Sequence, residues 1–161
     1  HVNLSGAELA QPDLPQRVAQ ALAAAGLAPE RLELEITETE MTADPRATLR
    51  VLEQLRAAGV RLALDDFGTG ATSLSTLRQF PLNILKIDGS FMPGLAEGHE
   101  NRHIVRAIVS MARGLDLTVV AEGVETEPQR VALMELGCRE GQGLRFAPPE
   151  LLPGSGGGSR T

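Results

Sequence analysis

The chain alternates short strand-like runs with longer helical segments. Residues 32–36 alternate apolar and polar side chains, which is the period of a strand, and short apolar runs follow at 61–64, 83–87 and 118–121. Between these runs, apolar side chains recur at helical spacing in segments near 13–25, 44–58, 100–115 and 126–136. Asp44-Pro45 is typical of a helix start, and Gly26, Gly59 and Gly137 are placed as helix stops.

This alternation predicts parallel strands joined by helical crossovers, in an α/β fold. Two architectures fit it: an open doubly wound sheet, and a (β/α)8 barrel of the TIM type. Such a barrel typically needs ~250 residues and rarely has fewer than ~200. The chain has 161 residues. If it folds as a barrel, we therefore expect the barrel to be incomplete.

Most strand-like runs end in a polar side chain just before the following loop. The residues in these positions are Asn3, Glu35, Asp65, Asp66, Lys86, Asp88, Glu122 and Gln142. The carboxyl ends of parallel strands form the ligand-binding face of α/β folds. We therefore expect these side chains to converge on one mouth of the sheet.

The expected mouth carries an excess of negative charge. Four carboxylates, from Glu35, Asp65, Asp66 and Glu122, face one ammonium group, from Lys86. Crowded carboxylates must take up protons or bind cations, and an oxygen-rich set without histidine suits Mg²⁺, Mn²⁺ or Ca²⁺. The adjacent Asp65-Asp66 pair would suit a two-metal site for phosphate-ester chemistry. A carboxylate at a strand end often caps a helix instead, so position alone leaves both interpretations open.

Composition narrows the class of protein. The length fits about one domain, and no apolar run is long enough for a transmembrane helix. The net charge of −6 argues against a nucleic-acid surface, and the single cysteine, Cys138, excludes an internal disulfide. The chain starts at His1 and ends in Gly and Ser residues. We interpret residues 1–150 as the folded domain of a larger protein and residues 151–161 as a disordered tail.

The motifs in these positions resemble those of one family. In chain order they are Val2-Asn3-Leu4-Ser5, Glu35-Ile36-Thr37-Glu38, Asp65-Asp66-Phe67-Gly68-Thr69-Gly70, Leu85-Lys86-Ile87-Asp88, Ala121-Glu122-Gly123-Val124-Glu125-Thr126 and Gln142-Gly143. They look like the successive motifs of the EAL domain, the bacterial cyclic-di-GMP-specific phosphodiesterase, over about residues 1–146. The resemblance implies a modified (β/α)8 barrel that hydrolyses cyclic-di-GMP to linear pGpG with Mg²⁺ or Mn²⁺.

The resemblance also implies a role for each matched residue. The implied metal ligands are Asn3, Glu35, Asp65, Asp66 and Glu122. Asp66 and Lys86 would hold the attacking water, and Lys86 would also offset charge on the phosphate. Glu125 would anchor the loop from Gly68 to Ser73, which the family links to metal binding and to a homodimer. Gln142 would orient the metal-site network.

Three departures from the family pattern change the expectation for this chain. The first strand, with the Glu-Ala-Leu motif that names the family, and the helix after it are not found upstream of Asn3. Ala71 stands where the family usually has tyrosine, and Leu144–Pro148 replace an aromatic-rich segment that ends in a cation. We therefore expect the chain alone to be inactive or nearly so.

Two other interpretations stay open. A degenerate EAL domain would bind cyclic-di-GMP or a protein partner without catalysis, and a truncated product would have no independent role. Lys86 and the paired aspartates favour an enzyme, because a receptor does not need them. In each case the resemblance implies a cytoplasmic location, or the cytoplasmic part of a larger membrane-bound protein, with no membrane segment and no nucleic-acid polymer as partner.

Overall fold

We describe residues 1–68, 70, 73–98 and 100–146 of a computed structural model of the chain. The strands are β1 (Val2–Asn3), β2 (Glu33–Thr37), β3 (Arg61–Phe67), β4 (Ile84–Ile87), β5 (Thr118–Ala121) and β6 (Glu140–Gly141). The helices are α1 (Gly6–Leu9), α2 (Leu14–Ala25), α3 (Glu38–Ala43), α4 (Pro45–Ala57), α5 (Leu74–Leu77), α6 (Glu100–Gly114) and α7 (Glu127–Glu135). Short 3₁₀ turns lie at Pro29–Arg31 and Gly89–Phe91.

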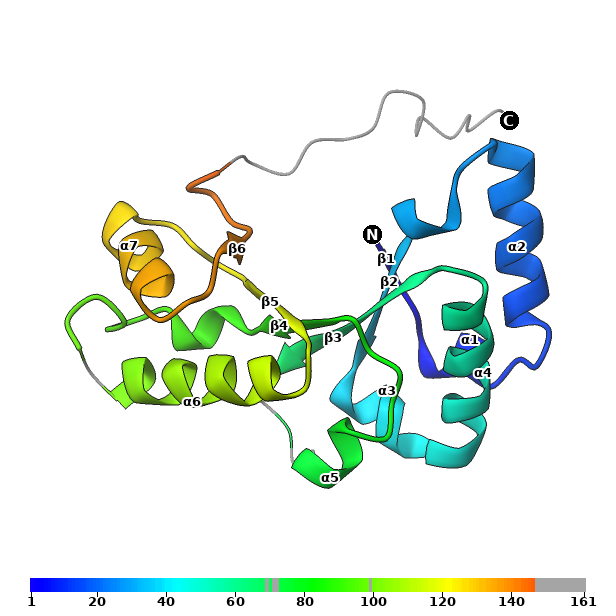
Figure 1. Cartoon of the computed structure of the whole chain (residues 1–161), viewed down its shortest axis with the longest axis horizontal. Helices are drawn as coiled ribbons and strands as arrows, with labels where there is room; N and C mark the ends of the chain where they lie inside the picture. Colours follow the sequence, from blue (N-terminus) through cyan, green and yellow to red (C-terminus); the bar gives the residue numbers. More distant parts are fainter. Residues whose placement is uncertain (69, 71–72, 99, 147–161) are drawn as a thin grey trace, which may run out of the picture.

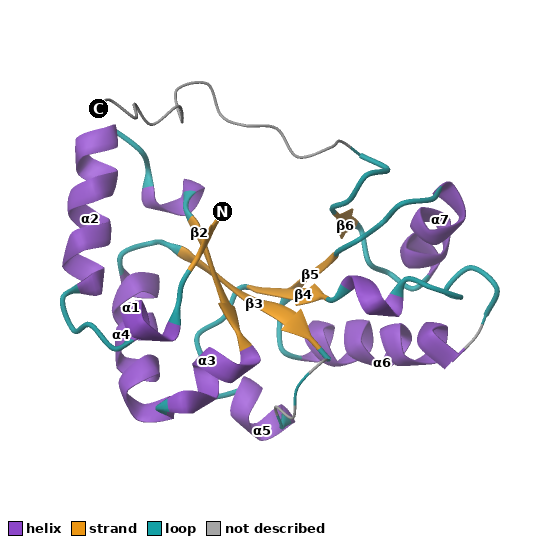
Figure 2. Cartoon of the chain, turned by 180° about the vertical axis from the view of Figure 1, so that it is seen from behind, coloured by secondary structure: helices purple, strands orange, loops and turns teal. Residues whose placement is uncertain are grey.

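The strand order decides between the two expected architectures. Each strand pairs in parallel with the next strand along the chain, in the order β1-β2-β3-β4-β5-β6. A doubly wound sheet reverses its order at a switch point, whereas a barrel keeps the sequential order. The helices lie outside the central row of strands, along both flanks and below it (Figures 1 and 2). The described residues therefore form an arc of a (β/α)8-type barrel, which confirms the predicted fold class.

Alternation along the strands separates the core from the site. Leu34, Leu62, Leu64 and Leu85 are almost fully buried in the hydrophobic core with the helices. The intervening residues share the opposite face of the sheet, which is the inner face of the arc. Each large apolar side chain buried in the core contributes ~1.5–3 kcal/mol to stability. The apolar residues of the outer face therefore stabilise the arc, and the polar residues of the inner face do not belong to this core.

The helix caps test the alternative interpretation, in which the carboxylates at strand ends cap the following helices. Thr37 and Thr126 each form a capping box, at the starts of α3 and α7. Asp88 accepts a hydrogen bond from the backbone N–H of Ser90 and so caps the 3₁₀ turn that follows β4. Threonines thus occupy the capping positions at the starts of α3 and α7. Glu35 and Glu122 are therefore not the N-caps of these two helices.

The four long helices begin and end within a few residues of their predicted bounds, whereas the one- and two-turn helices α1, α3 and α5 were not predicted. Among the described residues, no helix is long and apolar enough to cross a membrane. Ala71, Pro148 and the tail predicted at 151–161 lie outside the described residues.

Cys138 gives a direct test of this packing. Cys138 is 2% exposed, and burial raises the pKa of its thiol to about 11, although backbone hydrogen bonds act to lower it. We expect a disulfide reagent at pH 8 to modify the folded chain far more slowly than the chain in urea, because the thiolate is the reactive form. Leu64→Ala should cost ~2–5 kcal/mol of unfolding free energy and speed the modification. Equal rates with and without urea would contradict the described core.

Candidate metal centre

The centre is built around one buried ammonium group. Lys86, on β4, is the only lysine of the chain, and its side chain is 3% exposed. Its Nζ lies 2.7 Å from Oε1 of Glu35 on β2, 3.2 Å from Oδ1 of Asp65 on β3, and 2.6 Å from Oε1 of Glu122 after β5. Four consecutive strands of the arc thus bring their charged side chains to one point.

The strand register explains why these residues meet. Glu35 and Asp65 both occupy the inner face, because Glu35 pairs with Ala63 and Asp65 lies two residues further along β3. Lys86 pairs with Val120, and Glu122 lies two residues beyond Val120. Alternate residues of a strand share a face, so all four side chains project into the arc near its carboxyl edge.

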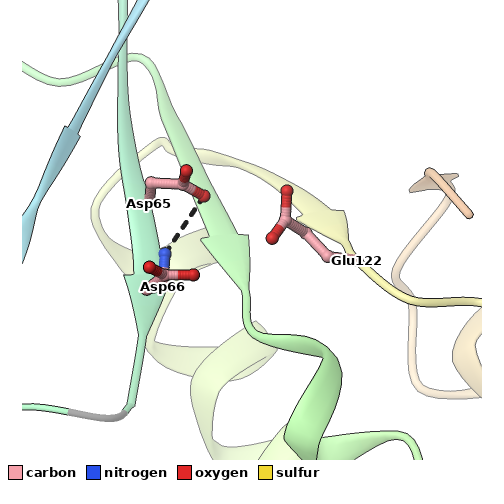
Figure 3. A group of neighbouring side chains, drawn as sticks. All are labelled: Asp65, Asp66 and Glu122. Atoms are coloured by element: carbon pink, nitrogen blue, oxygen red, sulfur yellow. Dashed lines mark hydrogen bonds between the residues drawn. The ribbon is translucent and has the colours of Figure 1, made fainter. Parts of the chain in front are cut away.

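A local irregularity adds Asp66 to the group. Regular alternation would place Asp65 and Asp66 on opposite faces, but the register of β3 with β4 shifts between Leu64 and Phe67. Asp66 has a left-handed backbone with φ of 53°, a conformation that Asp tolerates better than most residues, and its N–H donates to Oδ1 of Asp65 at 3.1 Å. One oxygen from each of Asp65, Asp66 and Glu122 lies within 4.8 Å of the others (Figure 3).

Lys86 does not balance all the negative charge of the carboxylates around it. Burial alone would lower the pKa of Lys86, but its close contacts with the carboxylates of Glu122 and Glu35 and the charge of Asp65 raise it, so the ammonium stays protonated. Burial raises the pKa of Glu122 in spite of Lys86. Burial and then the charges of Asp65 and Asp88 raise the pKa of Asp66. The folded site therefore disfavours two of its own carboxylates as anions, which a further cation would relieve.

Glu35 points to the same conclusion. Its Oε1 is buried and, although it lies 2.7 Å from Nζ of Lys86, it makes no hydrogen bond of acceptable angle in the described part of the chain. This oxygen is therefore held by the charge of Lys86 without a directed hydrogen bond, and it remains able to accept a further ligand. Together with the three oxygens of the acidic cluster, this donor set fits a hard divalent cation.

The other predicted residues are distributed around this group. Gln142 follows β6, and its Nε2 donates a hydrogen bond to Oε1 of Glu122. Asn3 lies beside Glu35 in the register of β1 with β2, at an exposed position. Glu125 is exposed, and its backbone N–H donates to Oε1 of Gln129. Glu35, Asp65, Asp66, Lys86, Glu122 and Gln142 are thus brought together, and Glu125 lies on the neighbouring loop.

Glu38 was not predicted to contribute, yet it contacts the loop after β3. It is the first residue of α3 and is 6% exposed, and its Oε1 accepts a hydrogen bond from the N–H of Gly68 at 3.0 Å. A Cβ on Gly70 would lie 2.7 Å from Oε2 of Glu38, so Gly70 lies directly against this carboxylate. The sequence did contain a sign of this contact, because a second acid, Glu38, follows the strand in Glu35-Ile36-Thr37-Glu38.

The loop-anchoring role expected of Glu125 stays a prediction. A homodimer through Gly68–Ser73 also stays a prediction, and part of that segment lies outside the described residues.

Comparison with known proteins adds independent evidence. The family model of the EAL domain matches residues 1–149. The chain is 45% identical over 148 residues to the bifunctional diguanylate cyclase/cyclic di-GMP phosphodiesterase MucR of Pseudomonas aeruginosa, covering 92% of this chain and 22% of that protein. The chain spans about a fifth of the length of the first curated relatives that it matches.

Solved structures agree with the sequence relatives. The structure of the MucR phosphodiesterase in complex with c-di-GMP matches with a TM-score of 0.86 and 45% identity, over 91% of this chain and 65% of that one. The EAL domain of Mycobacterium smegmatis DcpA matches with 0.87 and 38%, over 92% and 67%. Klebsiella pneumoniae BlrP1 in a manganese/cy-diGMP complex matches with 0.81 and 37%, over 88% and 36%.

Replacement of the buried ammonium group should be strongly destabilising. Lys86→Met leaves the buried Glu35 and its neighbours uncompensated, and we expect a loss of about 3–5 kcal/mol of unfolding free energy in urea titrations without metal. Arg61→Met is the matched control, because its ion pair with Glu33 is long, at 3.7 Å, and partly exposed. That control should cost no more than about 1 kcal/mol. Equal stability of the Lys86 variant and the unaltered chain would contradict the described network.

Proposed function

This chain belongs to the EAL domain family, and on that premise we propose that its site hydrolyses cyclic-di-GMP to linear pGpG with Mg²⁺ or Mn²⁺. The observation that carries the proposal is the convergence of Asp65, Asp66 and Glu122 beside the buried Lys86. The complexes of MucR with c-di-GMP and of BlrP1 with manganese and cy-diGMP support it. The proposal assigns this role to a domain of which residues 1–150 form a part, located in the cytoplasm or in the cytoplasmic part of a larger membrane-bound protein.

The metal ligands in this proposal are the oxygen donors of the inner face, namely Asn3, Glu35, Asp65, Asp66 and Glu122. When bound, a divalent cation neutralises charge on a phosphodiester and makes water a stronger acid. Gln142 holds Glu122 through its side-chain amide and so fixes the direction of that carboxylate. Asp65 in turn receives the backbone N–H of Asp66, which fixes one of its oxygens.

The roles of the catalytic groups follow from their charges. Lys86 stays protonated, so it acts as a fixed cation that stabilises the charge developing on phosphorus-bound oxygens, and not as a base. A carboxylate oxygen of Asp66 lies within 4.8 Å of oxygens of Asp65 and Glu122, which places Asp66 where it could accept a hydrogen bond from an attacking water and orient it. Glu122 contacts both Lys86 and Gln142, and so couples the fixed cation to the ligand set. Glu125 remains the proposed support for the neighbouring loop.

A binding module that senses cyclic-di-GMP without hydrolysis is the alternative. Such a module would require neither a buried lysine nor adjacent aspartates on one face. The shifted register of β3 brings Asp65 and Asp66 to the same side, which favours the enzyme.

The decisive experiment measures turnover in two forms of the protein with Mn²⁺ and cyclic-di-GMP. The first form is the chain alone, which we expect to be inactive or nearly so. The second is a fusion that adds the part of the MucR structure which this chain does not cover, so that the arc is closed into a barrel. We expect the fusion to release pGpG and its Lys86→Met variant to lose at least about a hundredfold in rate, as removal of one fixed transition-state donor does.

The outcomes of this experiment separate the hypotheses. A fusion that binds cyclic-di-GMP in calorimetry without producing pGpG would support the binding module and overturn the proposed enzyme. Turnover by the chain alone at the rate of the fusion would keep the enzyme but refute the expected inactivity of the chain.

Asp66→Asn should change metal affinity and stability in opposite directions. Removal of a carboxylate with a raised pKa relieves repulsion, and Asn accepts the left-handed backbone readily, so the metal-free variant should be more stable by up to about 1 kcal/mol. Its affinity for Mn²⁺ should fall at least about tenfold. The gain should be fully present above the raised pKa that Asp66 has in the folded chain, should fall as the pH drops through that pKa, and should vanish below the ordinary pKa of aspartate, where the carboxyl is protonated in both the folded and the unfolded state. Urea titrations and Mn²⁺ calorimetry measure the two effects, and a variant that is less stable without metal would count against the electrostatic account.

A further inference from the structure

Two neighbouring loops at the site are fastened together through their backbones. The β5 loop, residues 122–126, carries Glu122, and the β6 loop, residues 142–146, carries Gln142. The N–H of Val124 donates to the carbonyl of Gln142 at 3.1 Å, and the N–H of Arg145 donates to the carbonyl of Val124 at 3.0 Å. Gly143 has a φ of +149°, and a Cβ there would lie 2.5 Å from both N and O of Val124. Glycine at 143 thus allows direct contact between the two backbones.

An ion pair between Arg145 and Glu127 adds a side-chain contact between the β6 loop and the start of α7. Arg145 donates from Nε to Oε2 of Glu127 at 3.0 Å, and a terminal guanidinium nitrogen lies 2.8 Å from the same oxygen. Glu127 is the first residue of α7 and follows the β5 loop directly. The pair therefore joins the last part of the β6 loop to the helix that ends the β5 loop.

Glu127 is a well-held anchor for this pair. The start of α7 has a capping box, and Gln129 also donates from Nε2 to the carbonyl of Met92, which ties the helix to the segment after β4. The hydrogen bond from Arg130, with that from Arg145 adding to it, lowers the pKa of Glu127 to about 2. The carboxylate therefore stays charged throughout the neutral range, and the pair persists there.

The β6 loop needs such an anchor because its strand is short. β6 has two residues in its ladder with β5, pairing Val120 with Glu140 and Ala121 with Gly141. Few ladder hydrogen bonds mean a low free energy of local opening. Gln142, whose side chain holds Glu122, comes directly after this short strand. Arg145 lies within Leu144–Pro148, the segment that departs from the family pattern.

We propose that Arg145 is a positioning residue: through its ion pair with Glu127 it keeps the β6 loop against the β5 loop, so that Gln142 stays on Glu122. The effect on metal binding rests on the proposed function, whereas the effect on the loop does not. Arg145 touches none of the proposed metal ligands in the described residues and acts only through Gln142.

The test combines two variants of Arg145 with a matched control in the complete 161-residue chain. Arg145→Ala removes the pair, Arg145→Lys keeps a charge, and Arg130→Ala removes the other partner of Glu127 while leaving Arg145 in place. Amide hydrogen exchange is followed by NMR at the backbone N–H of Val124 and Gln142 and at the side-chain amide of Gln142. Calorimetry measures Mn²⁺ affinity in the same proteins.

We expect Arg145→Ala to speed exchange at these amides by about two- to fivefold, the size expected of an exposed ion pair, and to weaken Mn²⁺ binding in the same direction. Ile36 in β2 should exchange as in the unaltered chain, since the effect is local. Arg145→Lys should recover part of the loss, and Arg130→Ala should show none. In a Glu127→Gln background, Arg145→Ala should have no further effect.

Unchanged exchange in Arg145→Ala, or the same change in Arg130→Ala, would overturn the proposal. Faster backbone exchange with unchanged Mn²⁺ affinity and an unchanged Gln142 side-chain amide would show that the pair only stabilises the loop, and would overturn the positioning role. Failure of the unaltered chain to bind Mn²⁺ would count against the proposed function. The exchange measurements, including the Gln142 side chain, would still decide the role of Arg145.

Discussion

A single buried ammonium group surrounded by carboxylates is the constraint on which the site depends. Lys86 contacts Glu35, Asp65 and Glu122 within 3.2 Å, and it lies on a strand whose four residues are all buried. A buried lysine is stable only when opposite charges meet it, and those charges must come from other strands. The register of β2, β3 and β5 against β4 therefore has to be correct for the site to exist at all.

The same group shows why the arrangement calls for more than structural pairing. One lysine cannot satisfy all the acids that face it, since the pKa values of Asp66 and Glu122 are raised and Oε1 of Glu35 lacks a hydrogen bond of acceptable angle among the described residues. A chain selected only for stability would replace such acids by neutral residues. In the proposed function, divalent cations meet this remaining charge and would link the inner face of the arc to phosphodiester chemistry.

Much of the fold could be predicted from local patterns, because the helix start at Asp44-Pro45, the glycine stops and the period of residues 32–36 all act over short distances. The barrel arc could not be distinguished from a doubly wound sheet in this way, since strand order depends on contacts between distant residues. The position of most site residues followed from one rule, that polar side chains at the carboxyl ends of parallel strands converge.

Other features needed the structure. The side of the sheet that Asp66 occupies depends on the shifted register and on a left-handed backbone, neither of which is encoded by a simple period. The contact of Glu38 with Gly68 joins residues thirty positions apart. The ion pair of Arg145 with Glu127 could not be predicted either, because an exposed arginine has many possible partners as long as the positions of the loops are unknown. Long-range geometry, and not residue type, separates these cases from the predicted ones.

The most direct test of the central claim is anomalous X-ray scattering from crystals grown with Mn²⁺, using the chain closed into a complete barrel. The account predicts a manganese peak within coordination distance of oxygens from Asp65 and Glu122, on the inner face beside Lys86. Crystals in which those carboxylates point away from each other, or carry no manganese peak at saturating metal, would contradict it.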